Sequence, residues 1–249
     1  MKHPLRLAAF LGLMALPAQA FDLGDMNDTE RQVFRDEVRD FLMENPQVIM
    51  EAVAVLEARD AEAQAADDDR LVQANRAMLN DSELSWQGGN LEGDVTLIEF
   101  VDYRCGYCRR AHDEVAELVE SDGNIRLILK EFPILGEASL TSSRFAIATR
   151  QLAGDEAYKA VHDALITFTG DVTEPALMRM ANTFGLDGAA IVAHMESDAV
   201  TAVIAETRAL GQRLNINGTP TFVVQDEMVR GYVPLEAMRG IVADLRRDG

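Results

Sequence analysis

The two cysteines constrain this chain more than any other feature, because they stand together as Cys105-Gly106-Tyr107-Cys108 and the sequence holds no others. A mostly apolar run, VTLIEFV at 95–101, comes shortly before them and predicts a buried strand. From Cys108 to Leu118, apolar side chains recur at helical spacing and predict a helix. The sequence therefore places a dithiol at a strand-to-helix turn.

The position of each cysteine in this turn predicts its chemistry. A cysteine at the start of a helix lies at the positive end of the helix dipole, beside free amide N–H groups that favour the thiolate. Cys105 has that position, and we predict that it attacks the substrate, whereas Cys108 lies about one turn further in and resolves the mixed disulfide. The alternatives are a static structural bridge and a metal site of Cys105, Cys108 and His112, and the reduced pair also suits Cu(I).

The composition excludes several classes of protein. The chain has 23 Lys and Arg residues against 42 Asp and Glu residues, a net charge of -19, and lacks the positive surface that nucleic acids require. Two cysteines cannot build a scaffold of several disulfides, and only four histidines are present to complete a structural zinc site. We expect no nucleic-acid partner, no cofactor and no bound metal.

The N-terminus has the three parts of a secretory signal peptide. Lys2 and Arg6 are followed by an apolar run at 7–16, and Ala18-Gln19-Ala20 is a small-residue cleavage signal. We expect cleavage after Ala20, so that 1–20 is the signal peptide. The apolar run is too short to cross a bilayer. The mature chain is expected to be exported to a compartment where disulfides persist, and a cytosolic protein with an apolar N-terminal helix is the alternative.

Residues 21–87 predict an N-terminal helical segment. Two helices are expected within 28–79, the first capped by Asp28 or Thr29 and the second starting at Asn45-Pro46. The part at 57–70 has no apolar residue larger than alanine and predicts a solvated helix that buries little. Heptads are not sustained, so the pattern allows either an oligomerisation stalk or a helical extension on the main domain. The glycines at 82–94 predict a linker.

Residues 88–249 predict one α/β domain. After the dithiol helix, a second strand is expected at 125–132, followed by a helical stretch at about 139–214. Two short strands at 221–225 and 228–231 predict a hairpin, and Pro234 opens a closing helix.

The segment IEFVDYRCGYC, the helices between two halves of a thioredoxin fold, and Gly218-Thr219-Pro220 before a strand resemble the DsbA family of thiol-disulfide oxidoreductases over 95–249. The N-terminal motifs FLMENPQVIMEA and NRAMLND further resemble the ScsC and Com1-like branch, in which N-terminal helices can assemble the protein into trimers. The resemblance implies an α/β, thioredoxin-like fold with an inserted helical domain, preceded by an N-terminal helical stalk.

The resemblance also assigns roles to residues near the dithiol. Pro220 matches the cis proline that faces the dithiol in thioredoxin folds, whereas most X-Pro bonds are trans. Thr219, Gly106 and Tyr107 would contact the substrate. Taken alone, Pro220 would be interpreted as an ordinary turn proline.

Two charged residues on the strands are assigned in the same way. Glu99 matches the acidic residue that accepts a proton beneath the dithiol, and Lys130 would be its charge partner. Independently of the resemblance, a lone glutamate in an apolar strand is costly to bury unless it is paired. The alternative is that Glu99 lies at an exposed strand end.

The predicted function is that of a periplasmic thiol-disulfide oxidoreductase acting on exported proteins that contain cysteine, with a membrane redox partner that resets the dithiol. The pair Gly106-Tyr107 lacks the histidine of the best-known DsbA dipeptide, and Thr219 resembles the isomerase branch. Both differences point away from a pure oxidase, so oxidase and isomerase activity stay open. The alternatives are a copper-binding or copper-stress protein that uses the same dithiol, and a structural helical assembly with an inert bridge.

Overall fold

The computed structural model describes residues 24, 26–81 and 83–248, so the expected signal peptide and its cleavage site lie outside the described residues. The chain divides into two compact units, one ending at Arg59 and the other starting at Asp60. In the described part, no single helix has the length and apolar character needed to cross a membrane. Only the pair Gly188–His194 and Asp198–Arg213 meets that criterion of length and composition, with a bend of 60° between its helices.

The first unit holds α1 (Asp28–Glu44) and the beginning of α2 (Gln47–Leu79). The N-cap of α1 is Asn27 and not the expected Asp28 or Thr29, because Asn27 and Glu30 form a capping box. The Asn27 side chain accepts a hydrogen bond from the Glu30 amide, and the Glu30 carboxylate accepts one from the Asn27 amide. No residue of α1 is buried. Its apolar side chains are exposed, among them Val33, Phe34, Val38 and Phe41.

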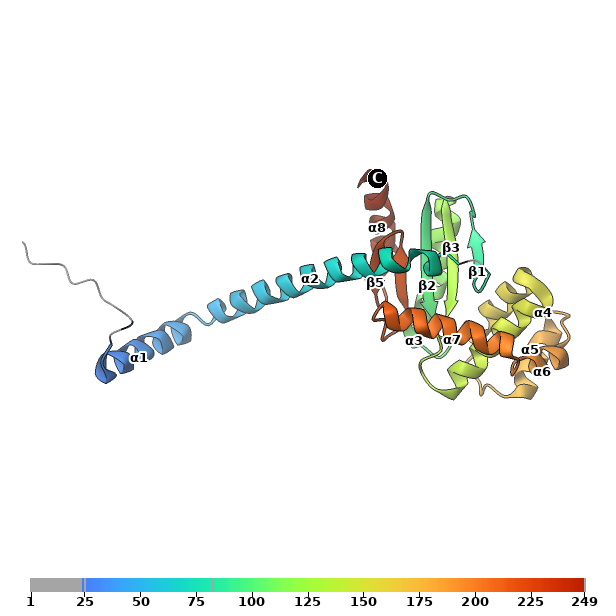
Figure 1. The fold of residues 1–249 in the computed structure, drawn as a ribbon, viewed down its shortest axis with the longest axis horizontal. Coiled ribbons are helices and arrows are strands. Elements are labelled where there is room, and N and C mark those ends of the chain that lie inside the picture. The colour runs from blue at the N-terminus through green and yellow to red at the C-terminus, as the bar shows by residue number, and fades with distance from the viewer. Residues whose placement is uncertain (1–23, 25, 82, 249) are drawn as a thin grey trace, which may run out of the picture. The chain divides into compact units, whose positions relative to one another are not determined.

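The second unit is built on a five-stranded mixed sheet with the strand order β1-β3-β2-β4-β5 (Figure 1). The strands are β1 (Trp86–Gly89), β2 (Val95–Val101), β3 (Ile125–Glu131), β4 (Thr221–Val224) and β5 (Glu227–Arg230). β2 and β3 are parallel, and the other neighbours are antiparallel. Strand β1 lies inside the expected linker at 82–94. The sequence did not reveal it because half of this short edge strand is glycine, which carries no apolar alternation.

The helices of the second unit follow the predicted order. α3 (Gly106–Asp122) connects β2 to β3, and α8 (Leu235–Asp248) closes the chain. Between β3 and β4 lie α4 (Glu137–Thr167), α5 (Glu174–Thr183), α6 (Gly188–His194) and α7 (Asp198–Arg213), which form the helical insertion expected at about 139–214. The predicted fold class, a thioredoxin-like α/β domain with a helical insertion and a helical N-terminal segment, is confirmed.

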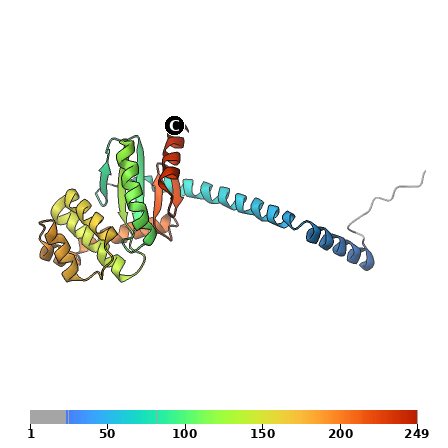
Figure 2. The ribbon, with the colours of Figure 1, turned by 180° about the vertical axis from the view of Figure 1, so that it is seen from behind.

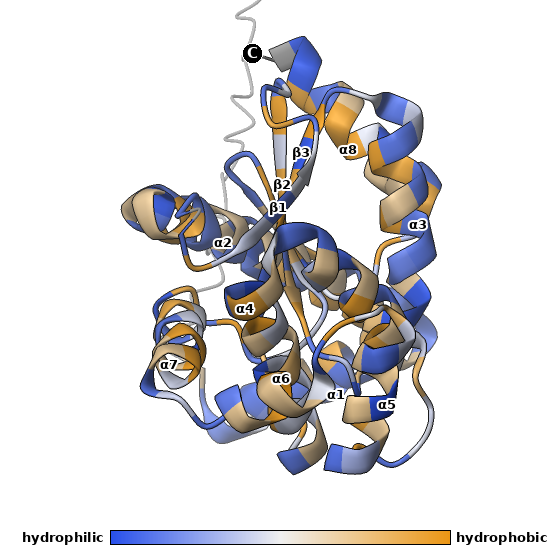
Figure 3. Cartoon of the chain, turned by 90° about the vertical axis from the view of Figure 1, so that its right-hand side faces the viewer, coloured by the Kyte–Doolittle hydropathy of each residue, from blue (hydrophilic) through white to orange (hydrophobic). Residues whose placement is uncertain are grey.

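Helices cover both faces of the sheet. α3 and α8 lie on one face, and α7 lies on the other with the end of α2 (Figures 1 and 2). Because side chains alternate along β2, Leu97 and Val101 join the core under α3, whereas Ile98 and Phe100 join a second core with Leu210 of α7. Hydrophilic and hydrophobic residues alternate along α4 and α7, as the mixed colouring of these helices shows (Figure 3). Burial on both faces explains the nearly continuous apolar run at 95–101.

The last part of α2 belongs to the second unit. Val72 and Leu79 are each 1% exposed and pack in the core between the sheet and α7. Asp68 is also buried, and its carboxylate accepts hydrogen bonds from Arg230 Nη2 at 2.6 Å and Nε at 3.0 Å. The compact domain therefore begins well before the expected boundary at 88. A few buried residues spaced along α2 are enough to attach this mostly polar helix to the domain.

Candidate active site

The dithiol lies where β2 turns into α3. Cys105 is the N-cap of α3, with an extended backbone (φ -77°, ψ 119°). Both cysteines are buried, but Cys105 keeps 6% of its surface exposed and Cys108 keeps none. The strand-to-helix placement is the predicted one, and Cys105 is the sulfur that solvent reaches.

Asp102 fixes this turn, a role that the sequence analysis missed. It is fully buried, and its Oδ1 accepts from the amide of Arg104 at 2.8 Å. Its Oδ2 accepts from the amides of Ile134 at 2.8 Å and Leu135 at 3.1 Å, which follow β3. The carboxylate thus connects the dithiol turn to the neighbouring loop. The sequence signal for such a turn is an aspartate directly after a buried strand, because its side chain can accept a hydrogen bond from the backbone amide two residues later.

The surroundings of Cys105 stabilise its thiolate. The Cys108 thiol donates to the Cys105 sulfur, and this contact does most to lower the pKa of Cys105 from 9.0 to about 5. Thr219 and the amides of Cys108 and Tyr107 at the start of α3 lower it further, against the opposing effect of burial. The pKa of Cys108 is raised, because Cys105 holds its hydrogen, the site is buried and Glu99 lies near. At neutral pH the negative charge therefore resides on Cys105, and Cys108 keeps its proton.

The loop before β4 brings Thr219 and Pro220 to the dithiol. The Thr219–Pro220 peptide bond is cis, as the resemblance predicted. The Thr219 carbonyl oxygen lies 3.0 Å from Cys105 Sγ and accepts a hydrogen bond from the protonated thiol. The Thr219 hydroxyl is buried, and no other described residue accepts its hydrogen, so it is available to the Cys105 sulfur.

Glu99 lies in the centre of the sheet and not at an exposed strand end. It stands opposite Leu129 of β3 and Phe222 of β4 and is 4% exposed. Burial, together with the negative charge of Cys105, raises the pKa of Glu99 to about 8. Its side chain lines a cavity of about 460 Å³, which gives its carboxyl group a route for a proton.

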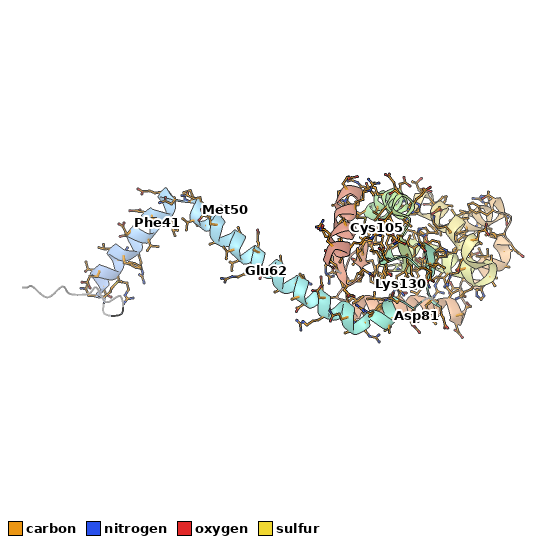
Figure 4. All side chains as sticks on the ribbon, turned by 90° about the horizontal axis from the view of Figure 1, so that it is seen from above. Phe41, Met50, Glu62, Asp81, Cys105 and Lys130 are labelled. Carbon is orange, nitrogen blue, oxygen red and sulfur yellow. The ribbon has the colours of Figure 1, made fainter. Side chains whose placement is uncertain are left out.

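Lys130 is not the charge partner of Glu99, so that prediction is wrong. In the register of β2 and β3, Lys130 stands opposite Phe100, one residue beyond Glu99, and its side chain therefore leaves the other face of the sheet. There Lys130 Nζ donates to the carbonyl oxygens of Met78 at 3.0 Å and Asp81 at 3.5 Å, at the end of α2 (Figure 4). Burial lowers the pKa of Lys130 to about 8. Lys130 thus caps α2 and has no contact with the dithiol side of the sheet.

A buried polar network that the sequence analysis missed lies beside the cavity. Glu131 Oε1 accepts from the hydroxyls of Tyr103 at 2.7 Å and Tyr158 at 2.6 Å, and Tyr103 Oη lies 2.9 Å from His162 Nδ1. Burial raises the pKa of Glu131 to about 7 and lowers that of His162 to about 3. The signal for this network in the sequence was the glutamate of the strand motif ILKEF, because a buried carboxylate requires hydrogen-bond partners.

The proposed metal trio of Cys105, Cys108 and His112 is not formed. Within the described residues, His112 groups with His162 and Asp163 instead, and no group of three suitable ligands contains either thiol. His112 points into the cavity from α3 and lies 3.2 Å from an Asp163 oxygen.

The outer side of the dithiol is open and aromatic. Tyr107 is 61% exposed and stacks on Tyr232, with 6.2 Å between ring centroids. The guanidinium group of Arg110 lies 4.3 Å from the centre of the Tyr232 ring. A side chain at Gly106 would meet no atom within 4 Å. A polypeptide can therefore approach Cys105 past Gly106 and Tyr107. The sequence analysis did not identify Tyr232.

Sequence comparison agrees with this geometry. The family described as "DSBA-like thioredoxin domain" matches residues 96–243, a range that includes both cysteines, Thr219 and Pro220. The chain belongs to this family. The members of this family are thiol-disulfide oxidoreductases. A second family, "Copper resistance protein ScsC N-terminal domain", matches residues 30–63 in α1 and α2.

Similar proteins are found among solved structures and curated sequences. A thioredoxin-like oxidoreductase from Silicibacter pomeroyi DSS-3 is 45% identical, with a TM-score of 0.64 over 70% of this chain and 98% of that one. The thiol-disulfide exchange protein α-DsbA2 from Wolbachia pipientis is 26% identical, with a TM-score of 0.67 over 76% of this chain and 98% of that one. Na(+)/H(+) antiporter NhaA 1 of Salinispora arenicola is 28% identical over 62% of this chain and 24% of its own length. The chain thus spans about a quarter of the curated antiporters that it matches.

Proposed function

We propose that this protein is a periplasmic thiol-disulfide oxidoreductase that acts on exported, cysteine-containing proteins as an oxidase or isomerase. The observation that carries the proposal is the division of charge within the dithiol. Cys105 has a pKa of about 5 and is the more accessible sulfur, whereas the pKa of Cys108 is raised. Only a thiolate attacks a disulfide, so the two positions have different roles in exchange.

In the isomerising or reducing direction, the Cys105 thiolate attacks one sulfur of a substrate disulfide, forms a mixed disulfide and releases the other substrate sulfur as a thiolate. In reduction, Cys108 then loses its proton to Glu99, whose ionised form is favoured once the mixed disulfide has removed the negative charge of Cys105. Cys108 attacks the Cys105 sulfur, so that the second substrate thiolate leaves and the Cys105–Cys108 disulfide forms. In isomerisation, another substrate thiolate attacks the substrate sulfur of the mixed disulfide instead, so that the Cys105 thiolate leaves and the substrate keeps a rearranged disulfide. In the oxidising direction, a substrate thiolate attacks Cys105 of that disulfide and Cys108 leaves as a thiolate, which takes a proton from Glu99. A second substrate thiolate then attacks the substrate sulfur of the mixed disulfide, so that the substrate disulfide forms and Cys105 leaves as a thiolate. A membrane redox partner would restore the starting state of the dithiol.

The role of Glu99 as proton acceptor is supported by burial and charge. Its pKa of about 8 is close to the operating pH, where a group both takes and returns a proton efficiently. The negative charge of Cys105 contributes to this raised pKa, so the proton affinity of Glu99 changes when the dithiol is oxidised. Glu99 also lines the cavity, through which water can carry the proton away.

The choice between oxidase and isomerase depends on how strongly the thiolate is stabilised. A thiolate of low pKa stabilises the reduced form and makes the disulfide more oxidising. The pKa of about 5 therefore supports an oxidising exchange even though Gly106 and Tyr107 provide no histidine. Measurement of the reduction potential against glutathione distinguishes an oxidase from an isomerase.

We also propose that the segment within 21–87 ahead of the compact domain mediates self-association, with a trimer as one outcome. The exposed apolar side chains of α1 need a cover, and the match to the ScsC N-terminal domain at 30–63 lies on the same helices. The segment contributes no residue to the dithiol surroundings described above.

Single-cysteine variants test the proposed enzyme. Cys105→Ser should abolish exchange with substrate disulfides, whereas Cys108→Ser should accumulate mixed disulfides that non-reducing electrophoresis detects. Alkylation of the reduced protein should modify Cys105 first. Faster alkylation of Cys108 would reverse the assignment of the two roles, and full exchange activity in Cys105→Ser would refute the proposed function.

A further inference from the structure

Three side chains with metal-binding atoms meet at the edge of the cavity, and the proposed exchange reaction uses none of them. His112 comes from α3, and His162 and Asp163 come from α4. One potential ligand atom from each residue lies within 4.8 Å of the other two. His112 and His162 also line the cavity of about 460 Å³.

The hydrogen bonds around His162 favour one ring nitrogen as the metal ligand. The Tyr103 hydroxyl donates its single hydrogen to Glu131 Oε1 at 2.7 Å when Glu131 is ionised. In the tautomer that carries its hydrogen on Nδ1, His162 then donates that hydrogen to the Tyr103 oxygen, at 2.9 Å. This arrangement leaves the lone pair of a neutral imidazole on His162 Nε2. A ligating histidine typically donates its other N–H to an oxygen in this way, which orients the ring and increases its basicity.

The distances suit a small tetrahedral ion. With metal–ligand distances near 2.0 Å, two ligand atoms of a tetrahedral zinc site lie about 3.3 Å apart. His112 Nε2 and Asp163 Oδ1 are 3.2 Å apart, so this pair already has the required spacing. The third ligand atom lies within 4.8 Å of both, so it has to move by less than about 2 Å to close the site. The cavity leaves room for water at the fourth position.

We propose that His112, His162 and Asp163 bind a divalent cation of the zinc type, with water as the fourth ligand. Two imidazoles and one carboxylate are a ligand set that Zn²⁺ accepts readily, and Mg²⁺ and Ca²⁺ disfavour it because they require oxygen ligands. Lys159 competes with the cation, since its Nζ lies 2.6 Å from Asp163 Oδ2. The ammonium group holds the site together when no cation is bound and lowers the affinity for one.

The experiment is a Zn²⁺ titration of the mature, full-length protein with its dithiol oxidised, so that the thiols cannot bind the metal. Calorimetry should give one site per chain. His112→Gln and Asp163→Asn should each weaken binding at least tenfold, and Lys159→Met should strengthen it. His194→Gln, which changes a half-buried histidine on α6 outside the trio, should leave binding unchanged. Retained circular dichroism and disulfide exchange show that each variant is folded.

Co²⁺ provides the second measurement. The visible absorption of bound Co²⁺ should report tetrahedral nitrogen and oxygen ligands without the charge-transfer band of a thiolate. Failure of the wild-type protein to bind Zn²⁺ would overturn the proposal. Binding that survives both His112→Gln and Asp163→Asn would also overturn it, because the metal would then lie elsewhere, and so would weaker binding in Lys159→Met.

Discussion

Replacing Glu99 by glutamine should stabilise the reduced protein at neutral pH while slowing its chemistry. Glutamine has the size of the protonated acid but never carries a charge, so it removes the cost of a buried carboxylate and also the proton acceptor. The pKa of Glu99 rises from 4.5 to about 8 in the folded chain, and the residue is 4% exposed. The energetic consequence therefore depends on pH.

The sign and size of this dependence follow from proton binding. Between pH 4.5 and 8 the folded protein retains the proton on Glu99 and the unfolded chain releases it, so stability falls as pH rises through this window. At pH 7 the resulting cost is about 3 kcal/mol, and above pH 8 it approaches about 5 kcal/mol. Below pH 4.5 the acid is neutral in both states, and the cost is zero.

The assay is urea unfolding of the reduced wild-type and Glu99→Gln proteins at a series of pH values from 4 to 8. The variant should match the wild type near pH 4 and exceed its free energy of unfolding by about 3 kcal/mol at pH 7. The difference should shrink in the oxidised proteins, because Cys105 then carries no charge. Exposed Glu92 provides a control, since Glu92→Gln should show no such divergence. Equal unfolding free energies of wild type and Glu99→Gln at every pH would refute the reasoning.

Three further predictions concern the surroundings of the dithiol and the N-terminal segment. Thr219→Val removes the hydroxyl that is available to the Cys105 thiolate. With about 1.5 kcal/mol for a hydrogen bond to a charged group, the ionisation constant of Cys105 should fall about tenfold, which thiolate absorbance measures as a function of pH. An unchanged titration would contradict this prediction. Lys130→Met should leave the exchange rate unchanged and lower the unfolding free energy by about 1 kcal/mol, because it uncovers carbonyl groups at the end of α2; slower exchange would restore Lys130 as a catalytic partner. A truncated chain that starts at Asp60 should sediment as a monomer with full exchange activity. A chain that starts at Gly88 lacks part of the core and should unfold. Self-association of the chain that starts at Asp60 would exclude the N-terminal helices as the interface.

The local elements near the dithiol could be predicted because neighbouring residues determine them. The apolar run at 95–101 marked β2, and the helical spacing after Cys108 marked α3. Asn27 was missed as the cap of α1 because several residues in that stretch can cap a helix, and the choice depends on which side chain also meets Glu30. Strand β1 was missed because only its pairing with β3 makes it a strand.

The sequence by itself determined the position of the dithiol, since two cysteines after an apolar strand and at the start of a helical pattern place it at the turn between β2 and α3. Tertiary structure decided the partners of every buried charge. Glu99 and Lys130 are close in the sequence pattern of two adjacent strands, yet a register offset of one residue sends them to opposite faces of the sheet. Lys130 therefore caps α2, and Glu99 faces the cavity with His112 and His162. The alternation of side chains along one strand is a local property. The register between two strands decides which residues face each other, and it depends on packing across the whole core.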